Sequence, residues 1–295
     1  MKVWARKAAL GTLGAMFHIG GERARRLVAE VLAAEGDYLP LTIETVPTLQ
    51  GSIRFFCLGD ISLWRARTLY SKEPETIEWI DTFTEGEVFW DVGANVGIYS
   101  LYAAVRSRVR VLAFEPGSAN YALINRNIEL NGLDGAVTAY SIAFSDRRCV
   151  DTLNMRDSGF GAALSSFGSS IDEAGASFAP KFRQGMIGYS IDQFIEEFDP
   201  SFPNHLKIDV DGIEDRIIDG ASKTLADERV KTVSIELDSA RPDHTDAVCR
   251  KITAGGLQFV SKRHAGMFDN GPYSSVYNYQ FRRSDVASRN WSSKT

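Results

Sequence analysis

The feature that most restricts the fold is an alternation of short apolar strands and helices that begins at residue 87. Val88–Asp91, Val109–Phe114 and Val137–Ser141 read as strands, and Ile98–Val105 and Ala119–Asn131 read as the helices between them. Strands and helices that alternate at this length form right-handed βαβ units. The strands of such units lie parallel in a sheet that helices cover on both faces.

The C-terminal half continues this alternation and then breaks it. Strands are expected at His205–Val210 and Val230–Leu237, each followed by a helix. Leu257–Lys262 and Val276–Phe281 then follow each other with no helix between them, as in an antiparallel pair. The sequence therefore predicts an α/β fold with a mostly parallel, seven-stranded sheet and an antiparallel final strand.

Residues 1–80 are expected to form an extension ahead of a main domain at residues 81–295. Glycines dilute the mildly apolar segment Ala8–Gly21, which favours an amphipathic helix over a secretory signal. A β-hairpin is expected at Leu41–Val46 and Ser52–Leu58, and a short helix at Glu75–Phe83. Two roles stay open for residues 1–70, a dimer contact or a wall of the acceptor site.

Charge and composition restrict the partners. The net charge of −5 argues against a general nucleic-acid binder. No apolar run reaches the roughly 20 residues that span a bilayer. The three cysteines lie far apart without a CxxC pair, which suits a reducing compartment. We therefore expect a cytoplasmic protein without a membrane span, and the sequence is also compatible with a homodimer.

A glycine loop, Asp91-Val-Gly-Ala-Asn-Val-Gly97, follows the first strand of the main domain. Glycines between a strand and a helix let the backbone approach a ligand closely. The spacing is not the GxGxxG of dinucleotide-binding proteins. An acid here would repel a pyrophosphate, but it suits a cationic ligand that carries an amino group and a sulfonium.

A second acid, Glu115, ends the next strand. A carboxylate at this place in the topology can accept hydrogen bonds from both hydroxyls of a ribose. Pro116 then prevents the strand ladder from continuing. Two acids at neighbouring strand ends, one of them joined to a glycine loop, indicate a nucleoside-containing ligand.

With these motifs the sequence resembles the FkbM-type methyltransferases over about residues 73–282. Besides Asp91–Gly97 and Phe114-Glu-Pro116, the resemblance rests on Glu73-Pro-Glu-Thr76, Asn125-x-Asn127, Ala143-Phe-Ser-Asp146, Ser190-Ile-Asp192 and Lys207–Glu214. Asp211 stands where many members carry Glu, which keeps the charge. The resemblance implies the class I, Rossmann-like methyltransferase fold and S-adenosylmethionine as cofactor. It also implies O-methylation of a hydroxyl on a sugar, glycolipid or polyketide-type natural product.

The resemblance further implies where the cofactor binds. It puts the glycine loop around the methionine moiety and Glu115 on the ribose, with Ser141, Ile142 and Ala143 beside the adenine. Asp91 would act indirectly, through loop amides or water. The expected cofactor site comprises Asp91, Gly93, Ala94, Asn95, Gly97, Glu115, Pro116, Ser141, Ile142, Ala143 and Asp209.

The reaction centre is expected among acids at the carboxyl ends of the later strands, where open α/β sheets hold their chemistry. Asp209, Asp211 and Glu214 form a dense acidic group, and Glu236 ends the next strand. Three roles stay open. One carboxylate could be the general base for the acceptor hydroxyl. Asp209, Asp211 and Glu236 could hold Mg²⁺, a metal that the sequence allows but does not favour. Otherwise the group caps a helix and binds substrate hydroxyls.

His264 is another candidate base, since its loop follows a strand and should open onto the same edge of the sheet. An imidazole exchanges protons near neutral pH, although a solvated loop histidine is the competing interpretation. The expected catalytic residues are therefore Asp209, Asp211 and His264. Lys207 is expected to form a salt bridge within the acidic group.

Residues 155–187 have the composition of a mobile lid, with aromatic side chains spaced through glycine and serine. Phe160, Phe167 and Glu236 are the expected acceptor contacts, and the acceptor is a small molecule or a glycan. Two other functions stay open. The chain could be a methyltransferase of the same fold that acts on protein or RNA, or a cofactor-binding domain without catalysis.

Overall fold

The computed structural model describes residues 42–171 and 174–284 of the 295-residue chain. The chain divides into two compact units, residues 1–41 and 42–295, and the described residues belong to the second. The amphipathic helix expected at the N-terminus lies outside the described residues.

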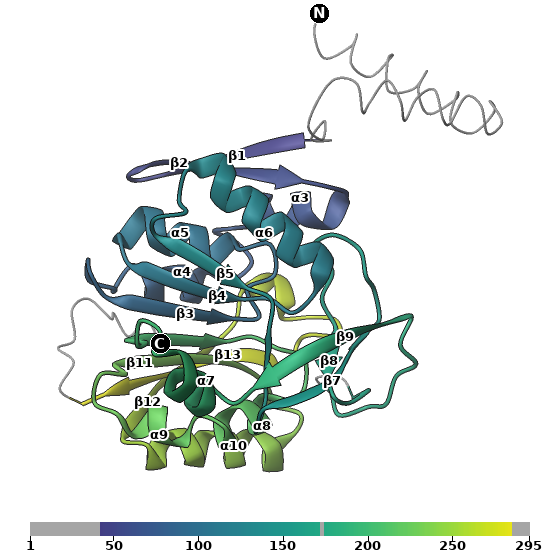
Figure 1. Cartoon of the computed structure of the whole chain (residues 1–295), viewed down its shortest axis with the longest axis vertical. Helices are drawn as coiled ribbons and strands as arrows, with labels where there is room; N and C mark the ends of the chain where they lie inside the picture. The colour runs from purple at the N-terminus through teal and green to yellow at the C-terminus, as the bar shows by residue number, and fades with distance from the viewer. Residues whose placement is uncertain (1–41, 172–173, 285–295) are drawn as a thin grey trace, which may run out of the picture. The chain divides into compact units, whose positions relative to one another are not determined.

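A seven-stranded sheet forms the centre of the described unit (Figure 1). Its order is β12 (Leu257–Arg263), β13 (Val276–Arg283), β11 (Thr232–Asp238), β10 (His205–Ile208), β3 (Val88–Val92), β4 (Arg110–Phe114) and β5 (Val137–Tyr140). β13 runs antiparallel to both of its neighbours, whereas β11, β10, β3, β4 and β5 pair in parallel. The predicted class I methyltransferase fold is confirmed, and the final strand inserts between the two strands before it.

Helices cover both faces of this sheet (Figure 1). One face carries α4 (Pro74–Ile80), α5 (Ile98–Ser107) and α6 (Ser118–Asn131), and the other carries α7 (Ile191–Phe198), α8 (Glu214–Asp219), α9 (Ser222–Ala226) and α10 (Pro242–Ala254). Successive side chains of a strand point to opposite faces, so Phe89 joins one apolar cluster and Trp90 the other. Both residues are fully buried, which explains why β3 reads as a continuous apolar run.

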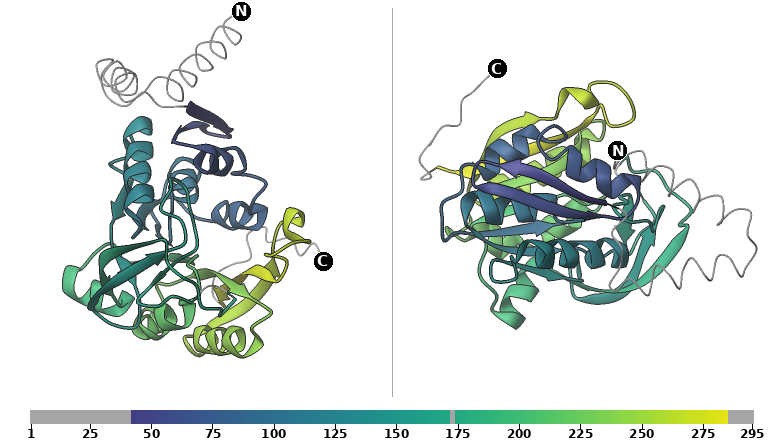
Figure 2. Two further views of the ribbon diagram at one scale, coloured as in Figure 1. Left: turned by 90° about the vertical axis from the view of Figure 1, so that its right-hand side faces the viewer. Right: turned by 90° about the horizontal axis from the view of Figure 1, so that it is seen from above.

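The predicted hairpin is confirmed as β1 (Thr42–Thr48) and β2 (Gly51–Cys57), followed by α3 (Asp60–Arg67). It lies on the outer side of the helix layer that contains α5 and α6 (Figures 1 and 2). The Asn127 side chain of α6 accepts the Phe56 N–H at 2.7 Å, and Ile53 and Phe55 are buried in the same cluster as α5 and α6. The hairpin is thus part of the core that supports the glycine loop.

A second, four-stranded sheet lies beside the main one (Figure 1). Its order is β6 (Ala143–Phe144), β9 (Phe182–Tyr189), β7 (Cys149–Met155) and β8 (Ser165–Phe167). Residues 155–187, which the sequence predicts as a mobile lid, therefore contain β8 and most of β9, and both strands pair with β7. Glycine and serine hide the strand pattern there, and the pairing with β7 supplies the order that local sequence does not show.

Candidate functional site

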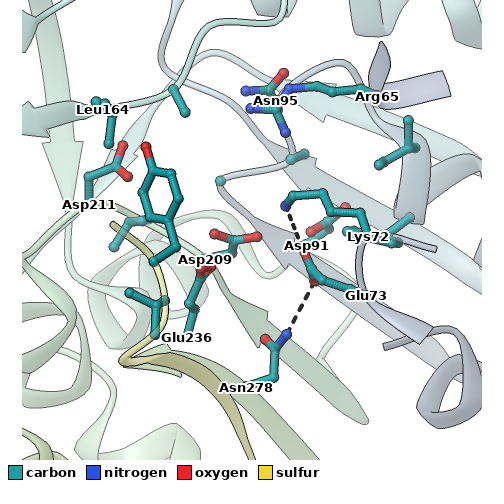
Figure 3. A pocket seen from close by; sticks show the side chains of 18 of the residues that line it. Arg65, Lys72, Glu73, Asp91, Asn95, Leu164, Asp209, Asp211, Glu236 and Asn278 are labelled. Atoms are coloured by element: carbon teal, nitrogen blue, oxygen red, sulfur yellow. Dashed lines mark hydrogen bonds and ion pairs between the residues drawn. The ribbon is translucent and has the colours of Figure 1, made fainter. Parts of the chain in front are cut away.

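A cavity of about 260 Å³ opens where β3, β4, β10 and β11 end at their carboxyl edge (Figure 3). Open α/β sheets bind their ligands at this edge. The lining combines the glycine loop, the ends of these strands, the segment before α4, and residues 162–165 of the connection from β7 to β8. Of the residues expected around the cofactor, Asp91, Gly93, Ala94, Asn95, Glu115, Pro116 and Asp209 line it.

The glycine loop packs directly against the end of β10. Gly93 has φ +84°, and a Cβ built there would lie 1.9 Å from the Asp209 carbonyl oxygen. Gly97 has φ +82°, and its Cβ would lie 2.5 Å from Cγ1 of Ile124. A side chain at either position would have to displace its neighbour and accept a strained backbone, which explains the two glycines of the motif.

Glu115 is fixed by backbone amides. The N–H groups of Asn95 and Gly117 donate to its two carboxylate oxygens at 2.8 and 2.7 Å. Burial raises the pKa of Glu115 to about 7, although these hydrogen bonds oppose the shift. Each carboxylate oxygen can accept a second hydrogen bond. The side chain can therefore receive two further hydroxyl donors from a ligand in the cavity.

Asp91 has a different partner from the one expected. The Ser100 hydroxyl of α5 donates to its carboxylate at 2.6 Å, and no loop amide among the described residues does so. Burial raises the pKa of Asp91 to about 6, against the attraction of Lys207. The residue thus ties β3 to the first turns of α5 and holds the loop between them.

A buried network of charges lies below the glycine loop. Lys207 is 1% exposed and forms the expected ion pair with Asp209. It also forms an ion pair with Glu73 at 3.8 Å, which the sequence did not predict. Lys72 contacts Glu73 at 2.5 Å, and Asn278 donates to Glu73 at 3.4 Å (Figure 3). Burial opposes the ionisation of Glu73, but the two ammonium groups hold its pKa well below the usual range.

The structure places the acids expected at the reaction centre in two neighbouring spaces. Asp209, Asp211 and Glu236 line the cavity, and the N–H of Ser165 donates to Asp211 at 2.8 Å. Glu214 lines only a smaller hollow next to it, where burial raises its pKa to about 8. Burial and the nearby Asp209 also raise the pKa of Glu236. Among the described residues, no group of three or more His, Cys, Asp or Glu side chains is arranged to hold a metal ion.

His264 lines the cavity, but both of its ring nitrogens have protein partners. Nδ1 lies 2.9 Å from the Val276 carbonyl oxygen, and Nε2 lies 3.2 Å from the Asp269 carboxylate. The ring stacks on Tyr277 with centroids 4.0 Å apart. These contacts position His264 as part of the cavity wall.

Several expected contacts lie elsewhere. Ser141, Ile142 and Ala143 do not line the cavity, because the chain leaves the main sheet after Tyr140 and enters the second sheet through β6. Phe167 is 2% exposed and packs in the core, so it is not available to an acceptor in this structure. Phe160 is 40% exposed and does not reach the cavity.

Nothing in the sequence indicated which residues of α3, α4 and the segment between them contribute to the cavity. Trp64, Arg65, Lys72, Glu73 and Glu75 line the cavity. Glu73-Pro-Glu-Thr76 was visible as part of a motif, but nothing in its pattern indicated that it would meet residues of β10 and β13.

A second missed contribution is the turn at residues 161–165, which closes one side of the cavity. The Arg65 side chain donates to the Gly161 carbonyl at 2.6 Å, and the Gly161 N–H donates to Asn120 at 2.8 Å. Asn95 and Asn120 both donate to the Ala162 carbonyl, at 2.8 and 3.0 Å. The turn is therefore tied to α3, α6 and the glycine loop.

Comparison with known proteins gives one family and several solved structures. The family described as "Methyltransferase FkbM domain" matches residues 91–256. No curated protein matches the chain. No helix in the described ranges is long and apolar enough to cross a membrane.

The solved structures share little sequence with the chain. Precorrin-6y C5,15-methyltransferase from Geobacter metallireducens GS-15 is 14% identical with a TM-score of 0.42, over 72% of this chain and 87% of that one. TYW2 from P. horikoshii, in complex with MeSAdo, is 11% identical with a TM-score of 0.43, over 90% and 83%. TYW2 from M. jannaschii, in complex with AdoMet, is 13% identical with a TM-score of 0.40, over 84% and 89%.

Proposed function

The chain belongs to the FkbM methyltransferase family, and we propose that it transfers a methyl group from S-adenosylmethionine to a hydroxyl of a small-molecule or glycan acceptor. The observation that carries this proposal is one cavity that joins the glycine loop and Glu115 to the carboxylates Asp209, Asp211 and Glu236. The first group suits a nucleoside cofactor, and the second can take up the proton of a hydroxyl.

The polar groups that line the cavity fit the cofactor. Glu115 has free acceptor capacity for the ribose hydroxyls. Glu75 is 1% exposed and lines the cavity, and its Oε2 has no hydrogen-bond partner in the described part of the chain. An ammonium group would satisfy this oxygen and would be attracted by Glu73 and Asp209. When bound, S-adenosylmethionine supplies an electrophilic methyl group on a positively charged sulfur.

The remaining lining supports a hydroxylated acceptor. Trp64 and Tyr273 offer flat faces on which a sugar or another ring can stack. Carboxylates nearby can orient hydroxyl groups and receive a proton. The same acids would repel the phosphates of a nucleic acid, which agrees with the net charge of −5.

Calorimetric titration with S-adenosylmethionine and S-adenosylhomocysteine tests the cofactor assignment. We expect saturable binding of both ligands, about tenfold or more weaker in Glu115→Ala, since a hydrogen bond to a charged group contributes about 1.5–3 kcal/mol. Glu129→Ala, on the exposed side of α6, is the matched control and should bind as the wild type does. A folded protein that binds neither ligand would refute the proposal.

The acceptor class is tested by incubating the protein with methyl-labelled S-adenosylmethionine and panels of hydroxylated, amine and RNA acceptors. Label should appear as an ether on hydroxylated compounds, as identified by mass spectrometry. Label on RNA or on a protein would show that the chain methylates a different class of acceptor, and the O-methylation assignment would then be wrong. Cofactor binding without transfer to any acceptor would indicate a binding domain without catalysis.

A further inference from the structure

Glu236 occupies a junction in the candidate site. It lies on β11 beside Asn278 of β13, where the main cavity meets a smaller hollow of about 40 Å³. Leu164, Val210, Asp211, Tyr273 and Val276 also line both spaces. An acceptor that extends from the cavity into the hollow would therefore pass directly by the Glu236 carboxylate.

Each of the other candidate bases already has at least one protein partner. Asp209 is paired with Lys207, Asp211 accepts the Ser165 N–H, and both nitrogens of His264 have partners. In contrast, no hydrogen bond and no ion pair links the Glu236 carboxylate to any residue of the described ranges. A general base needs a lone pair that is free to meet the proton it removes.

We infer that Glu236 is the general base of the methyl transfer, an assignment that rests on the proposed function. The acceptor O–H bond breaks, its proton moves to a carboxylate oxygen of Glu236, and the electron pair left on the acceptor oxygen forms the bond to the methyl carbon. The carbon–sulfur bond breaks at the same time, and its electron pair stays on sulfur as a neutral thioether.

The charges around Glu236 link this role to cofactor binding. Asp209 and Lys207 of β10 and Lys72 and Glu73 of the segment before α4 act on it. Asp211 and His264 line the same cavity. Burial raises the pKa of Glu236, and the nearby acids raise it further against the two ammonium groups, which favours the protonated side chain. A cation bound close by favours the ionised form. Binding of a sulfonium ligand should therefore shift Glu236 towards the carboxylate form.

Proton release on binding separates this role from a structural one. Calorimetry in two buffers of different ionisation enthalpy counts the protons released with each cofactor form. The wild type should release more protons with S-adenosylmethionine than with S-adenosylhomocysteine, whose sulfur is neutral. Glu115 contributes equally to both counts because the ribose is the same. Glu236→Gln should remove the difference, while Glu228→Gln, at an exposed position, should keep it.

Turnover gives the second readout. Glu236→Gln should lower kcat by about 10²–10⁴-fold with the acceptor KM nearly unchanged, as expected for the loss of a general base. Glu236→Asp should restore part of the rate with a shifted pH profile, and it replaces the glutamine variant in both measurements if that variant does not fold.

Two results must be distinguished. The inference is overturned if Glu236→Gln binds both cofactor forms and keeps kcat within about threefold of the wild type, or if the wild type releases equal numbers of protons with both. Failure of the folded wild type to bind either cofactor form refutes the proposed function instead.

Discussion

Replacement of Lys207 by Met should test the buried charge network directly. The Lys207 ammonium is 1% exposed, pairs with Asp209 and lies 3.8 Å from Glu73. It also lies 5.0 Å from the ring centre of Tyr99. Methionine has a similar length and fills the space without a charge. The substitution therefore leaves the acids around it without their central cation.

The expected loss in the free energy of unfolding can be estimated from burial. Removal of one partner from a buried ion pair costs about 3–5 kcal/mol, because the other charge stays buried and unpaired. The matched control is Lys231→Met, whose ammonium lies 2.6 Å from Glu87 but whose side chain is 39% exposed. Glu87 also keeps His205 as a second partner, so loss of this more exposed pair should cost only about 0–1 kcal/mol. The two variants should thus differ by at least about 2 kcal/mol in the free energy of unfolding.

The loss of stability in Lys207→Met should also depend on pH. Lys207 lowers the pKa of both Asp91 and Glu73 in the folded protein, so these acids are easier to protonate in the variant. A protonated acid no longer needs the missing cation. The deficit of Lys207→Met should therefore be largest near pH 8 and should shrink as the pH falls towards 5.

Urea unfolding followed by tryptophan fluorescence measures both effects, since Trp79 and Trp90 are fully buried. The comparison covers the wild type, Lys207→Met and Lys231→Met at pH 5.5 and pH 8. The slope of the unfolding free energy against urea concentration should be the same in all three. Equal losses in the two variants, or a deficit that grows at the lower pH, would show that the network does not stabilise the fold in this way.

Three further predictions follow from the site. Gly93→Ala should destabilise the protein by about 1–3 kcal/mol or more and weaken cofactor binding, whereas Gly135→Ala, with open space around its Cβ, should do neither in thermal melts and titrations. Affinity for S-adenosylhomocysteine should rise about tenfold from pH 6 to pH 8 as Glu115, with a pKa of about 7, becomes an ionised acceptor; a flat profile would contradict that role. His264→Phe should keep the stacking on Tyr277 and change kcat by only about threefold, so a loss of 10²-fold would restore His264 as the base.

Local chemistry alone determined most elements of the main sheet and part of the cavity that we propose for the cofactor. Apolar runs of strand length, each followed by a glycine or an acid, indicated β3, β4 and the loop Asp91–Gly97. The structure places Glu115 in the cavity, where backbone amides hold its carboxylate. These features follow from periodicity and from the backbone freedom of glycine. Both depend on residues close together in the chain, which explains why the sequence reveals them.

Tertiary structure alone decided which distant residues share the cavity. Lys72 and Glu73 meet Lys207 and Asp209 more than 130 positions along the chain, and Asn278 approaches from β13. The exit of the chain after Tyr140 and the burial of Phe167 depend on how β6, β7, β8 and β9 pair. Such contacts result from the packing of whole elements against one another, and no periodic pattern within a single element encodes its partner.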